Sequence, residues 1–373
     1  MSSFAEKNAE FALNLLKCTS NASENAFLSP ASISIAFGMS LGGARGNTAR
    51  QICDTLFGGL PESEIHDHYK TLTEYLSKPH ELYQLSGANR MYAPMGYETK
   101  KGFIDFLAEC YKSDCVTKDF SKNTEVSEEI NQWVEERTNG RIKNLTSPSA
   151  ITPLTRAILI NALYFKAEWR HKFNPCKTNR LKFYCAPDKE LQVPLMGMDD
   201  QPYFYTEDDQ CQVLGVRYKV DNLAMFALLP KERFGLSALE EGLTGQRLLQ
   251  LMEKAMERSA VVDVTFPKFK MEKSMELTDA LTKLGVTDIF QGGRANLTGI
   301  CDREDLFVSA VLHKTFVEVN EEGTEAAAAT GMFSMTMCGR INRLRFRADH
   351  PFLLSIFDSD AKSLLFLGRC VEP

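Results

Sequence analysis

The sequence predicts an α+β fold in a single domain, residues 1–373, and three observations lead to that prediction. Apolar residues at helical spacing dominate the first third of the chain, whereas β-rich apolar runs recur through the rest. The 373 residues, 44% of them hydrophobic, supply enough material for a large core. No Gly/Ser-rich or Pro-rich linker interrupts the chain, and no repeat with a period of roughly 20–50 residues is visible.

The individual elements follow from the periodicity of the apolar residues. Helical spacing predicts early helices over residues 9–17, 32–41 and 48–56. Apolar runs rich in β-branched and aromatic residues predict later strands over residues 161–165, 261–266, 307–311 and 352–357. The predicted fold rests on these segments.

Charge and metal-ligand spacing exclude several classes of function. The formal net charge of −6 argues against a nucleic-acid partner. The ten cysteines include no Cys-x-x-Cys pair, and a domain of this size needs no disulfides, so we expect mostly buried thiols. His66 and His68 lie two residues apart on a polar predicted helix and would face different ways. We therefore expect neither a metal site nor a cofactor.

Targeting signals are also absent from the pattern of the chain. The first ten residues contain no continuous apolar core, so no classical signal peptide is predicted. No apolar run is long enough to span a membrane. We expect the cytosol, with secretion by an unconventional route or through an uncleaved signal as the alternative. In that case the Asn-x-Ser/Thr sequons would matter, at Asn21, Asn144 and Asn296.

One short motif could indicate an enzyme. Residues 38–42, Gly-Met-Ser-Leu-Gly, match the Gly-x-Ser-x-Gly nucleophile elbow of hydrolases, with Ser40 as the nucleophile. That motif works only where a strand turns sharply into a helix. The residues before it are predicted to be helical already, so we expect Ser40 to have no catalytic role and the chain not to be an enzyme.

The segment 321–330, Glu-Glu-Gly-Thr-Glu-Ala-Ala-Ala-Ala-Thr, is the most informative part of the sequence. Read with period two, it places Thr324 and the alanines 326 and 328 on one small, uncharged face, and Glu325 on the other. Such a face could enter between two strands without a clash. Local propensity equally allows a short surface helix, because alanine is the best helix former. Residues 331–339 then carry no charge and several Met and Phe residues before Arg340.

The surrounding blocks resemble the serpin superfamily of serine protease inhibitors, in its ovalbumin-like intracellular (clade B-like) form. Residues 25–32, Asn-Ala-Phe-Leu-Ser-Pro-Ala-Ser, resemble the N-terminal signature of that family. Further blocks follow in family order at residues 138–145, 161–169 and 264–270. The resemblance covers residues 4–373 and implies helices packed around three β-sheets. It also implies an exposed reactive-centre loop at about residues 321–345.

The resemblance also implies roles for particular residues. The breach and the shutter are the two places where the central sheet of a serpin opens. The resemblance would place Trp169 at the breach, and Ser29, Ser32, Asn161 and His313 at the shutter. Each of them is equally compatible with an ordinary structural role. The hinge of the loop would comprise Glu321, Gly323, Thr324, Glu325, Ala326, Ala327, Ala328, Ala329 and Thr330.

The implied function is inhibition, in which a serine protease cleaves the loop, forms a covalent acyl-enzyme, and is trapped when the loop enters the central sheet. The alternative is a non-inhibitory serpin that acts as chaperone, carrier or storage protein. Such relatives usually carry a charged or bulky residue at the inward hinge positions, or a proline within the hinge, whereas here the inward positions hold Thr324 and alanines and no proline occurs between Gly323 and Arg340. Residues 62–75 are acidic on balance, so we expect no heparin binding. We expect a monomer.

The sequence leaves the position of the scissile bond open. Counting seventeen residues from Glu321 places it at Met337–Cys338, whereas counting back from residues 350–352 places it one residue later, at Cys338–Gly339. The alternative is a trypsin-directed inhibitor that uses Arg340, cleaved before Ile341. The count from Glu321 places the apolar residue Met337 at the bond, which favours proteases with medium apolar pockets, such as elastase-, chymotrypsin- or cathepsin G-like enzymes.

Overall fold

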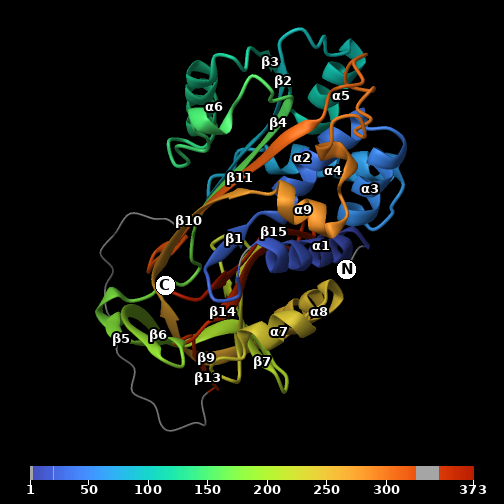
Figure 1. Ribbon diagram of the computed structural model, residues 1–373. Coiled ribbons are helices and arrows are strands. Elements are labelled where there is room, and N and C mark those ends of the chain that lie inside the picture. Colours follow the sequence, from blue (N-terminus) through green and yellow to red (C-terminus); the bar gives the residue numbers. More distant parts are fainter. Residues whose placement is uncertain (1–2, 20, 325–343) are drawn as a thin grey trace.

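The computed structural model describes residues 3–19, 21–324 and 344–373, and within these ranges the chain forms helices and two hydrogen-bonded sheets (Figure 1). The described α-helices are α1 Ser3–Thr19, α2 Pro30–Gly43, α3 Gly46–Phe57, α4 Glu62–Leu76, α5 Lys101–Tyr111, α6 Asn123–Arg137, α7 Leu236–Gly242, α8 Gly245–Met256 and α9 Thr278–Leu284. The described strands are β1 Ala26–Leu28, β2 Tyr83–Pro94, β3 Cys115–Lys118, β4 Ala157–Glu168, β5 Asn179–Ala186, β6 Lys189–Glu207, β7 Cys211–Arg217, β8 Leu223–Pro230, β9 Ser259–Pro267, β10 Phe269–Glu276, β11 Val308–Val319, β12 Gly323–Thr324, β13 Leu344–Arg347, β14 Phe352–Asp358 and β15 Ser363–Cys370.

A six-stranded sheet, ordered β10-β11-β12-β4-β2-β3, separates two groups of helices. In Figure 1, α6 covers one face of this sheet, and α2 to α5 gather on the other side. Strand β4 is buried over most of its length because both of its faces are covered, and its first part is apolar except for Asn161. Its residues Ile158 and Ile160 pack with α6, while Ala157 and Leu159 belong to the core on the helical side.

The second sheet has nine strands and follows the order β1-β15-β14-β8-β7-β6-β9-β13, with β5 paired to β6. Strand β6 pairs with β5 through its first half and with β7 through its end, so hydrogen bonding continues across all nine strands. The expected three sheets are therefore connected as two hydrogen-bonded units. The α+β class itself is confirmed.

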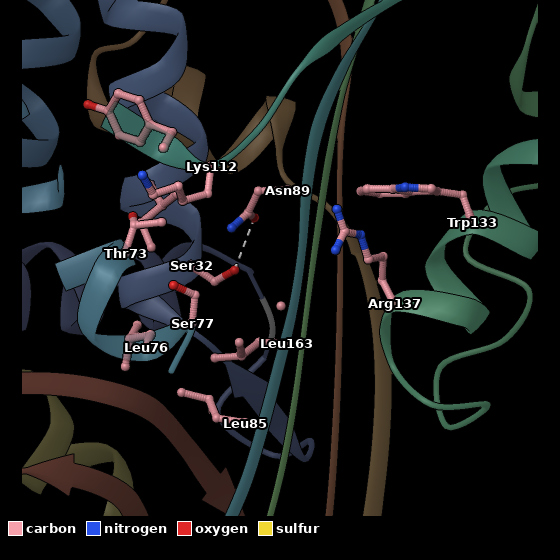
Figure 2. Close-up of a pocket in the computed structure, with 13 residues that line it drawn as sticks. Ser32, Thr73, Leu76, Ser77, Leu85, Asn89, Lys112, Trp133, Arg137 and Leu163 are labelled. Atoms are coloured by element: carbon pink, nitrogen blue, oxygen red, sulfur yellow. Dashed lines mark hydrogen bonds between the residues drawn. The ribbon is translucent and has the colours of Figure 1, made fainter. Parts of the chain in front are cut away.

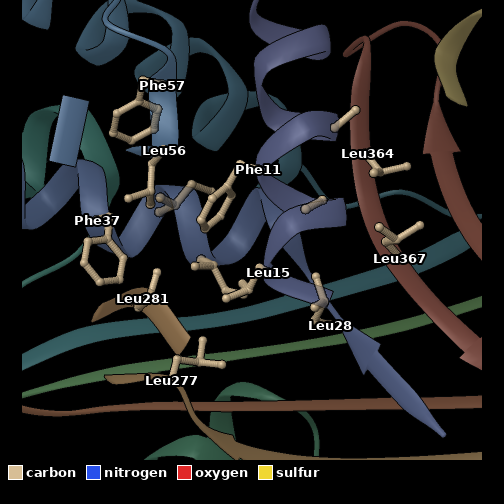
Figure 3. Packing of buried hydrophobic residues seen from close by; sticks show 14 of the residues in the cluster. Phe11, Leu15, Leu28, Phe37, Leu56, Phe57, Leu277, Leu281, Leu364 and Leu367 are labelled. Carbon is tan, nitrogen blue, oxygen red and sulfur yellow. The ribbon is translucent and has the colours of Figure 1, made fainter. Parts of the chain in front are cut away.

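The largest apolar core lies between the helices and the C-terminal strands. Figure 3 shows side chains of α1, α3 and β15 converging there, among them Phe11, Leu56 and Leu364. Helix α2 is apolar on all sides and runs through this core, with nearly every residue buried. Ser29 caps its N-terminus by accepting a hydrogen bond from the Ser32 backbone nitrogen, and Pro30 occupies the first turn.

The predicted helices and strands all occur, although several are longer than the periodicity indicated. The strand predicted at residues 307–311 continues to Val319 as β11, and the first helix begins at Ser3 rather than at residue 9. Ser40 lies inside α2, is buried, and donates its hydroxyl hydrogen to the Ala36 carbonyl at 3.1 Å, so it has no strand-to-helix turn around it.

The two histidines of α4 point in different directions, because His66 contacts Tyr111 and His68 stacks on Phe4.

The expectation that most cysteines are buried is wrong for the described part of the chain. All nine described cysteines are free, but only four of them are buried. Cys18, Cys53 and Cys110 are half-buried because they lie on the flanks of helices whose other faces fill the core. Among the described residues no cluster of His, Cys, Asp or Glu could hold a metal ion. No helix of the described segments combines the length and apolarity needed to cross a membrane.

Candidate functional site: the seam of the central sheet

The candidate site is the seam between β4 and β11, which we define as residues 157–164 of β4 and 308–316 of β11. These two strands are parallel and pair directly along the seam. At its end they diverge, and the two-residue strand β12 lies between them. Thr324 pairs with Val319 of β11 and with Ala167 of β4, antiparallel to both. Gly323 and Thr324, which come directly before the undescribed residues, are therefore already part of the sheet.

Close packing holds β12 in this position. Thr324 is fully buried, and its hydroxyl is 2.7 Å from the hydroxyl of Tyr218. Gly323 lies so close to β4 that a Cβ atom there would be 2.1 Å from the Ala167 carbonyl oxygen. A residue with a side chain cannot take this place without moving the strand. The turn from β11 closes because the Asn320 nitrogen donates to the Gly323 carbonyl at 3.0 Å.

Trp169 fixes the turn between β11 and β12. Its ring is fully buried and stacks on Tyr218, with the two centroids 4.6 Å apart. Its indole nitrogen donates to the Asn320 carbonyl at 2.9 Å, and its backbone nitrogen donates to the Glu322 carbonyl at the same distance. Trp169 thus packs into the core through its ring, and its two hydrogen bonds hold the backbone of Asn320 and Glu322, which leads into β12.

The two glutamates of this turn are held by lysines from neighbouring connections, one after β4 and one between β9 and β10. Glu321 accepts from Lys268 at 2.8 Å and from Thr178 at 2.9 Å, and Glu322 pairs with Lys172. Burial raises the pKa of Glu321, but the hydrogen bonds from Lys268 and Thr178 outweigh that effect and hold the pKa below its ordinary value. The carboxylate of Glu321 is therefore charged at neutral pH and anchors the base of β12.

A hydrogen-bonded network crosses the middle of the seam. His313 of β11 and Asn161 of β4 are direct partners in the parallel register, and the imidazole Nδ1 bonds the Asn161 side-chain oxygen. The Asn161 amide nitrogen donates to the Ser32 hydroxyl at 2.6 Å and also to Asn89 of β2. The Ser29 backbone nitrogen donates to His313 Nε2 at 3.1 Å. Four residues expected from the sequence are thus in one buried cluster.

These contacts define the protonation of His313. Because Nε2 accepts a hydrogen bond from a backbone N–H, the proton lies on Nδ1 and the ring is neutral. Burial lowers the pKa of His313 to about 3, since no carboxylate compensates for the lost water. The Ser29 hydroxyl donates to the Leu365 carbonyl of β15 at 2.7 Å, which ties the network to the second sheet.

Comparison with known proteins identifies the family. A model of the family described as Serpin (serine protease inhibitor) matches residues 6–373. The chain belongs to the serpin family. This serpin is 38% identical to Serpin B6 of Macaca fascicularis over 383 residues, and 37% identical to the leukocyte elastase inhibitor of Homo sapiens over 381 residues; both matches cover 100% of each chain. The crystal structure of a thermophilic serpin, tengpin, in the native state matches with a TM-score of 0.91 at 26% identity, over 100% of this chain and 95% of that one.

The structure also includes residues of this serpin that the sequence did not single out. Asn89 joins the network because it faces Asn161 in the antiparallel register of β2 and β4. Tyr218, the residue after β7, pairs with Trp169 and reaches Thr324 from the nine-stranded sheet's side, and no sequence motif marks it. Of the expected site residues, those of the hinge after Thr324 and those of the proposed scissile bonds lie outside the described residues, namely Glu325, Ala326, Ala327, Ala328, Ala329, Thr330, Met337, Cys338 and Arg340.

The neutral His313 predicts a pH dependence of stability. Its folded-state pKa of about 3 lies below the ordinary 6.5. Between these pH values the imidazole is therefore protonated in the unfolded chain and neutral in the folded one. Stability from this group is fully present above pH 6.5 and declines as the pH falls toward 3. Between pH 7.5 and 5 the loss amounts to about 2 kcal/mol in the free energy of unfolding.

Guanidinium unfolding of the parent protein and of His313→Gln at pH 5 and 7.5 measures this effect. We expect the variant to be less stable at pH 7.5 but to lose about 2 kcal/mol less than the parent on acidification. His66, His68 and His171, whose pKa values are also lowered chiefly by burial, are present in both proteins and cancel. An identical pH dependence in both proteins would show that His313 is protonated in the folded state.

Proposed function

We propose that this serpin inhibits serine proteases by inserting its cleaved reactive-centre loop, at about residues 321–345, into the seam of the central sheet. The observation that carries this proposal is β12, which is antiparallel to both β4 and β11 and stands at the open end of their parallel pairing. Continuing β12 along the seam would replace one parallel ladder by two antiparallel ladders, which are slightly more stable per residue.

The covalent step follows the ordinary chemistry of a serine protease. The hydroxyl oxygen of the protease serine attacks the carbonyl carbon of Met337, the bond to the Cys338 nitrogen breaks, and that nitrogen takes the proton from the protease histidine. The acyl-enzyme now tethers the protease to residue 337. About fourteen residues, 324–337, at roughly 3.3 Å each then enter as a strand about 45 Å long. Moving the protease so far distorts its site before water can release it.

The seam is built so that it can part. Polar bonds between His313, Asn161 and Ser32 are directional and can re-form on a new strand, whereas an interlocked apolar core cannot. Small residues on the Thr324 face of the hinge fit the same requirement. We therefore assign the hinge to residues 321–330, the shutter to the His313 network and the breach to Trp169.

The remaining features of the proposal concern partners and place of action. The partner is the target protease in a covalent complex, and the serpin itself is a monomer with no catalytic activity and no cofactor. Heparin is not expected as a partner, since the first turn of α4 carries Glu62 and Glu64. We expect the protein to act in the cytoplasm, with export as the alternative. The protein named leukocyte elastase inhibitor motivates elastase-like enzymes as the first targets to test.

A panel of serine proteases tests the function directly. The intact protein is incubated with elastase, chymotrypsin, cathepsin G and trypsin, and the products are separated on denaturing gels. Inhibition by this mechanism gives an adduct that survives denaturation and has the summed mass of the serpin and the protease. Cleavage without an adduct for every protease would favour the chaperone, carrier or storage alternative.

The identity of residue 337 should control specificity. Methionine is unbranched and flexible, so it fits a medium apolar pocket but offers no charge to a trypsin-like one. Met337→Arg should transfer adduct formation from elastase- or chymotrypsin-like enzymes to trypsin. The matched change Met335→Arg, two residues earlier, should not. Rates of adduct formation with each protease provide the measurement.

Mass spectrometry of the released C-terminal peptide locates the bond. A peptide that begins at Cys338 supports cleavage after Met337, and one that begins at Gly339 shifts the site by one residue. A peptide that begins at Ile341, together with a stable trypsin adduct of the unmodified protein, would show that the protease cleaves after Arg340 instead.

A further inference from the structure

Two free cysteines from distant parts of the sequence lie at the same end of the six-stranded sheet, where β11 begins. Cys115 is the first residue of β3, and Cys301 lies in the connection between α9 and β11. Cys115 is half-buried, whereas Cys301 is only 1% exposed, and both pack in the same apolar core. In Figure 1 the orange segment that leads into β11 lies beside α5, the helix that directly precedes β3.

Cys115 is fixed by β2 and by the segment before α5. It stands opposite Met91 in the parallel register of β2 and β3. The Thr99 hydroxyl donates to the Cys115 sulfur at 3.8 Å. Burial raises the pKa of the Cys115 thiol to about 11, and the charges of Asp114 and Cys301 add to that rise. Cys301 is therefore among the groups that are close enough to act on Cys115.

Cys301 is fixed by the residue that follows Thr99. The Lys100 backbone nitrogen donates to the Ile300 carbonyl at 2.7 Å, and the Lys100 ammonium lies 2.7 Å from an Asp302 carboxylate oxygen. The residues on both sides of Cys301 are thus bound to Lys100. Because Thr99 and Lys100 are consecutive, this short stretch of chain holds β3 and the segment around Cys301 together.

The two cysteines belong to opposite sides of the seam. Strand β3 pairs with β2, and β2 pairs with β4, so Cys115 is on the side of β4. Cys301 leads into β11, and its segment is bound to the end of α2, where the Gly299 nitrogen donates to the Gly43 carbonyl at 3.0 Å. Insertion at the seam requires β4 to part from β11. A covalent bond between the two cysteines would therefore cross a boundary that has to open.

Figure 2 shows the same boundary further along β2. Trp133 and Arg137 of α6 lie on one side of the strands, and Ser32 of α2 lies on the other. The contact drawn as a dashed line, from the Ser32 hydroxyl to the Asn89 side-chain oxygen, is 3.2 Å long. A single hydrogen bond contributes little net stability, so the strands can shift against α2. A disulfide across the boundary would not yield in this way.

We propose that Cys115 and Cys301 form a disulfide under oxidising conditions, and that this bond holds the seam closed. Formation of the bond is independent of the proposed function, whereas its effect on inhibition rests on that function. In reducing surroundings such as the cytosol the two thiols stay free and the loop can insert. In an oxidising compartment the same chain would be cleaved as a substrate and would not trap the protease.

The bond forms by thiol–disulfide exchange with glutathione disulfide. Cys115, the more exposed of the two, loses its proton, and its sulfur attacks one sulfur of glutathione disulfide, whose S–S bond breaks. The first glutathione leaves as a thiolate and takes up a proton. The Cys301 sulfur then loses its proton to water, attacks the Cys115 sulfur and releases the second glutathione, which is protonated in turn. The two protein thiols are thereby oxidised, and one glutathione disulfide is reduced to two thiols.

Mass spectrometry of the intact, folded protein tests the bond without any protease. The protein is incubated with excess glutathione disulfide at pH 8.5, since the raised pKa of Cys115 makes the first step slow at pH 7. The remaining thiols are alkylated, and a tryptic digest is analysed without reduction. We expect a linked pair of the peptides 113–118 and 295–303, which contain Cys115 and Cys301, and its loss after treatment with dithiothreitol. Glutathione on Cys115 as the final product, or alkylation of both thiols, would overturn the proposal.

Variants check that the pairing is specific. Cys301→Ala removes one partner and should give no linked peptide, and Cys115→Ser should give the same result from the other side. Cys53→Ser, on α3, changes another half-buried cysteine and should form the linked peptide in full yield. Loss of the linked peptide in Cys53→Ser would contradict the assigned pairing.

The effect on the seam has its own readout. Oxidised protein, mixed with a protease that the reduced protein traps, should be cleaved but give roughly tenfold less adduct on denaturing gels, because insertion is slowed. Prior reduction with dithiothreitol should restore the adduct. Cys301→Ala retains the other cysteines and should lose far less adduct after the same oxidation. An equal loss in the parent and in Cys301→Ala, or no loss from fully linked protein, would overturn the closed seam. A reduced protein that traps no protease would instead contradict the proposed function, while the linked peptide still decides the disulfide.

Discussion

Cleavage of the reactive-centre loop near Met337 should make this serpin far more resistant to heat. In the intact chain β4 and β11 pair in parallel, and of the residues that the structure describes only Gly323 and Thr324 stand between them. After cleavage the rest of the hinge is free to continue β12 along the whole seam. The backbone groups of the inserted residues would then pair with β4 on one side and β11 on the other, and the small face of the hinge would be buried.

Thermal melts of intact and nicked protein measure this effect. We expect the midpoint to rise by tens of degrees; a rise of about 20 °C corresponds to about 16 kcal/mol in a chain of 373 residues. A protease that cuts the loop without being trapped provides the nicked form. Equal melting temperatures would mean that the loop does not enter the sheet, and would favour a carrier, chaperone or storage role.

The elements of the fold were largely predictable because their signals are local. Helix α2 shows this: its apolar residues recur with helical period, and that reading also excluded Ser40 as a nucleophile before the structure showed it inside the helix. Strand lengths were less predictable. Strand β11 continues past residue 311 because His313 and Lys314, polar in sequence, are satisfied there by hydrogen bonds that only the folded chain provides.

The site was predictable in part, and for a different reason. The four residues proposed for the shutter came from resemblance, and the structure brings them together through contacts between distant segments. Asn89 and Tyr218 escaped notice because their importance depends on register and on the approach of two sheets. A single sequence carries no local signal for either of these features.

The start of the hinge illustrates how tertiary structure overrides propensity. Alanine favours a helix, and local sequence allowed one across residues 324–330. At Thr324, the one residue of this stretch that the structure describes, the chain forms a strand with Gly323, since the gap between β4 and β11 offers backbone partners on both sides. Entry of Ala326 and its neighbours in the same register after cleavage would bury the Thr324 face along the seam, so a charge on that face should block it.

Thr324→Arg should convert this serpin from an inhibitor into a substrate. The Thr324 side chain is fully buried and bonded to Tyr218, whose ring stacks on Trp169, and the Thr324 backbone pairs with Ala167. Arginine there would have to carry an unpaired charge into this site, at a cost of several kcal/mol. Each 1.4 kcal/mol added to the barrier slows insertion about tenfold. Hydrolysis of the acyl-enzyme then becomes faster than insertion, and the protease is released in active form.

The expected result is full cleavage of the loop with almost no covalent adduct on denaturing gels. Glu325→Arg is the matched control, since period two places residue 325 on the outward face, where a charge remains in water and the adduct should persist. Thr324→Ser keeps the hydroxyl that meets Tyr218 and should also inhibit. Nicked Thr324→Arg should gain little heat resistance, because its loop stays outside the sheet. A normal yield of adduct from Thr324→Arg would refute insertion at the seam, since no strand that begins at Gly323 could enter there without burying that charge.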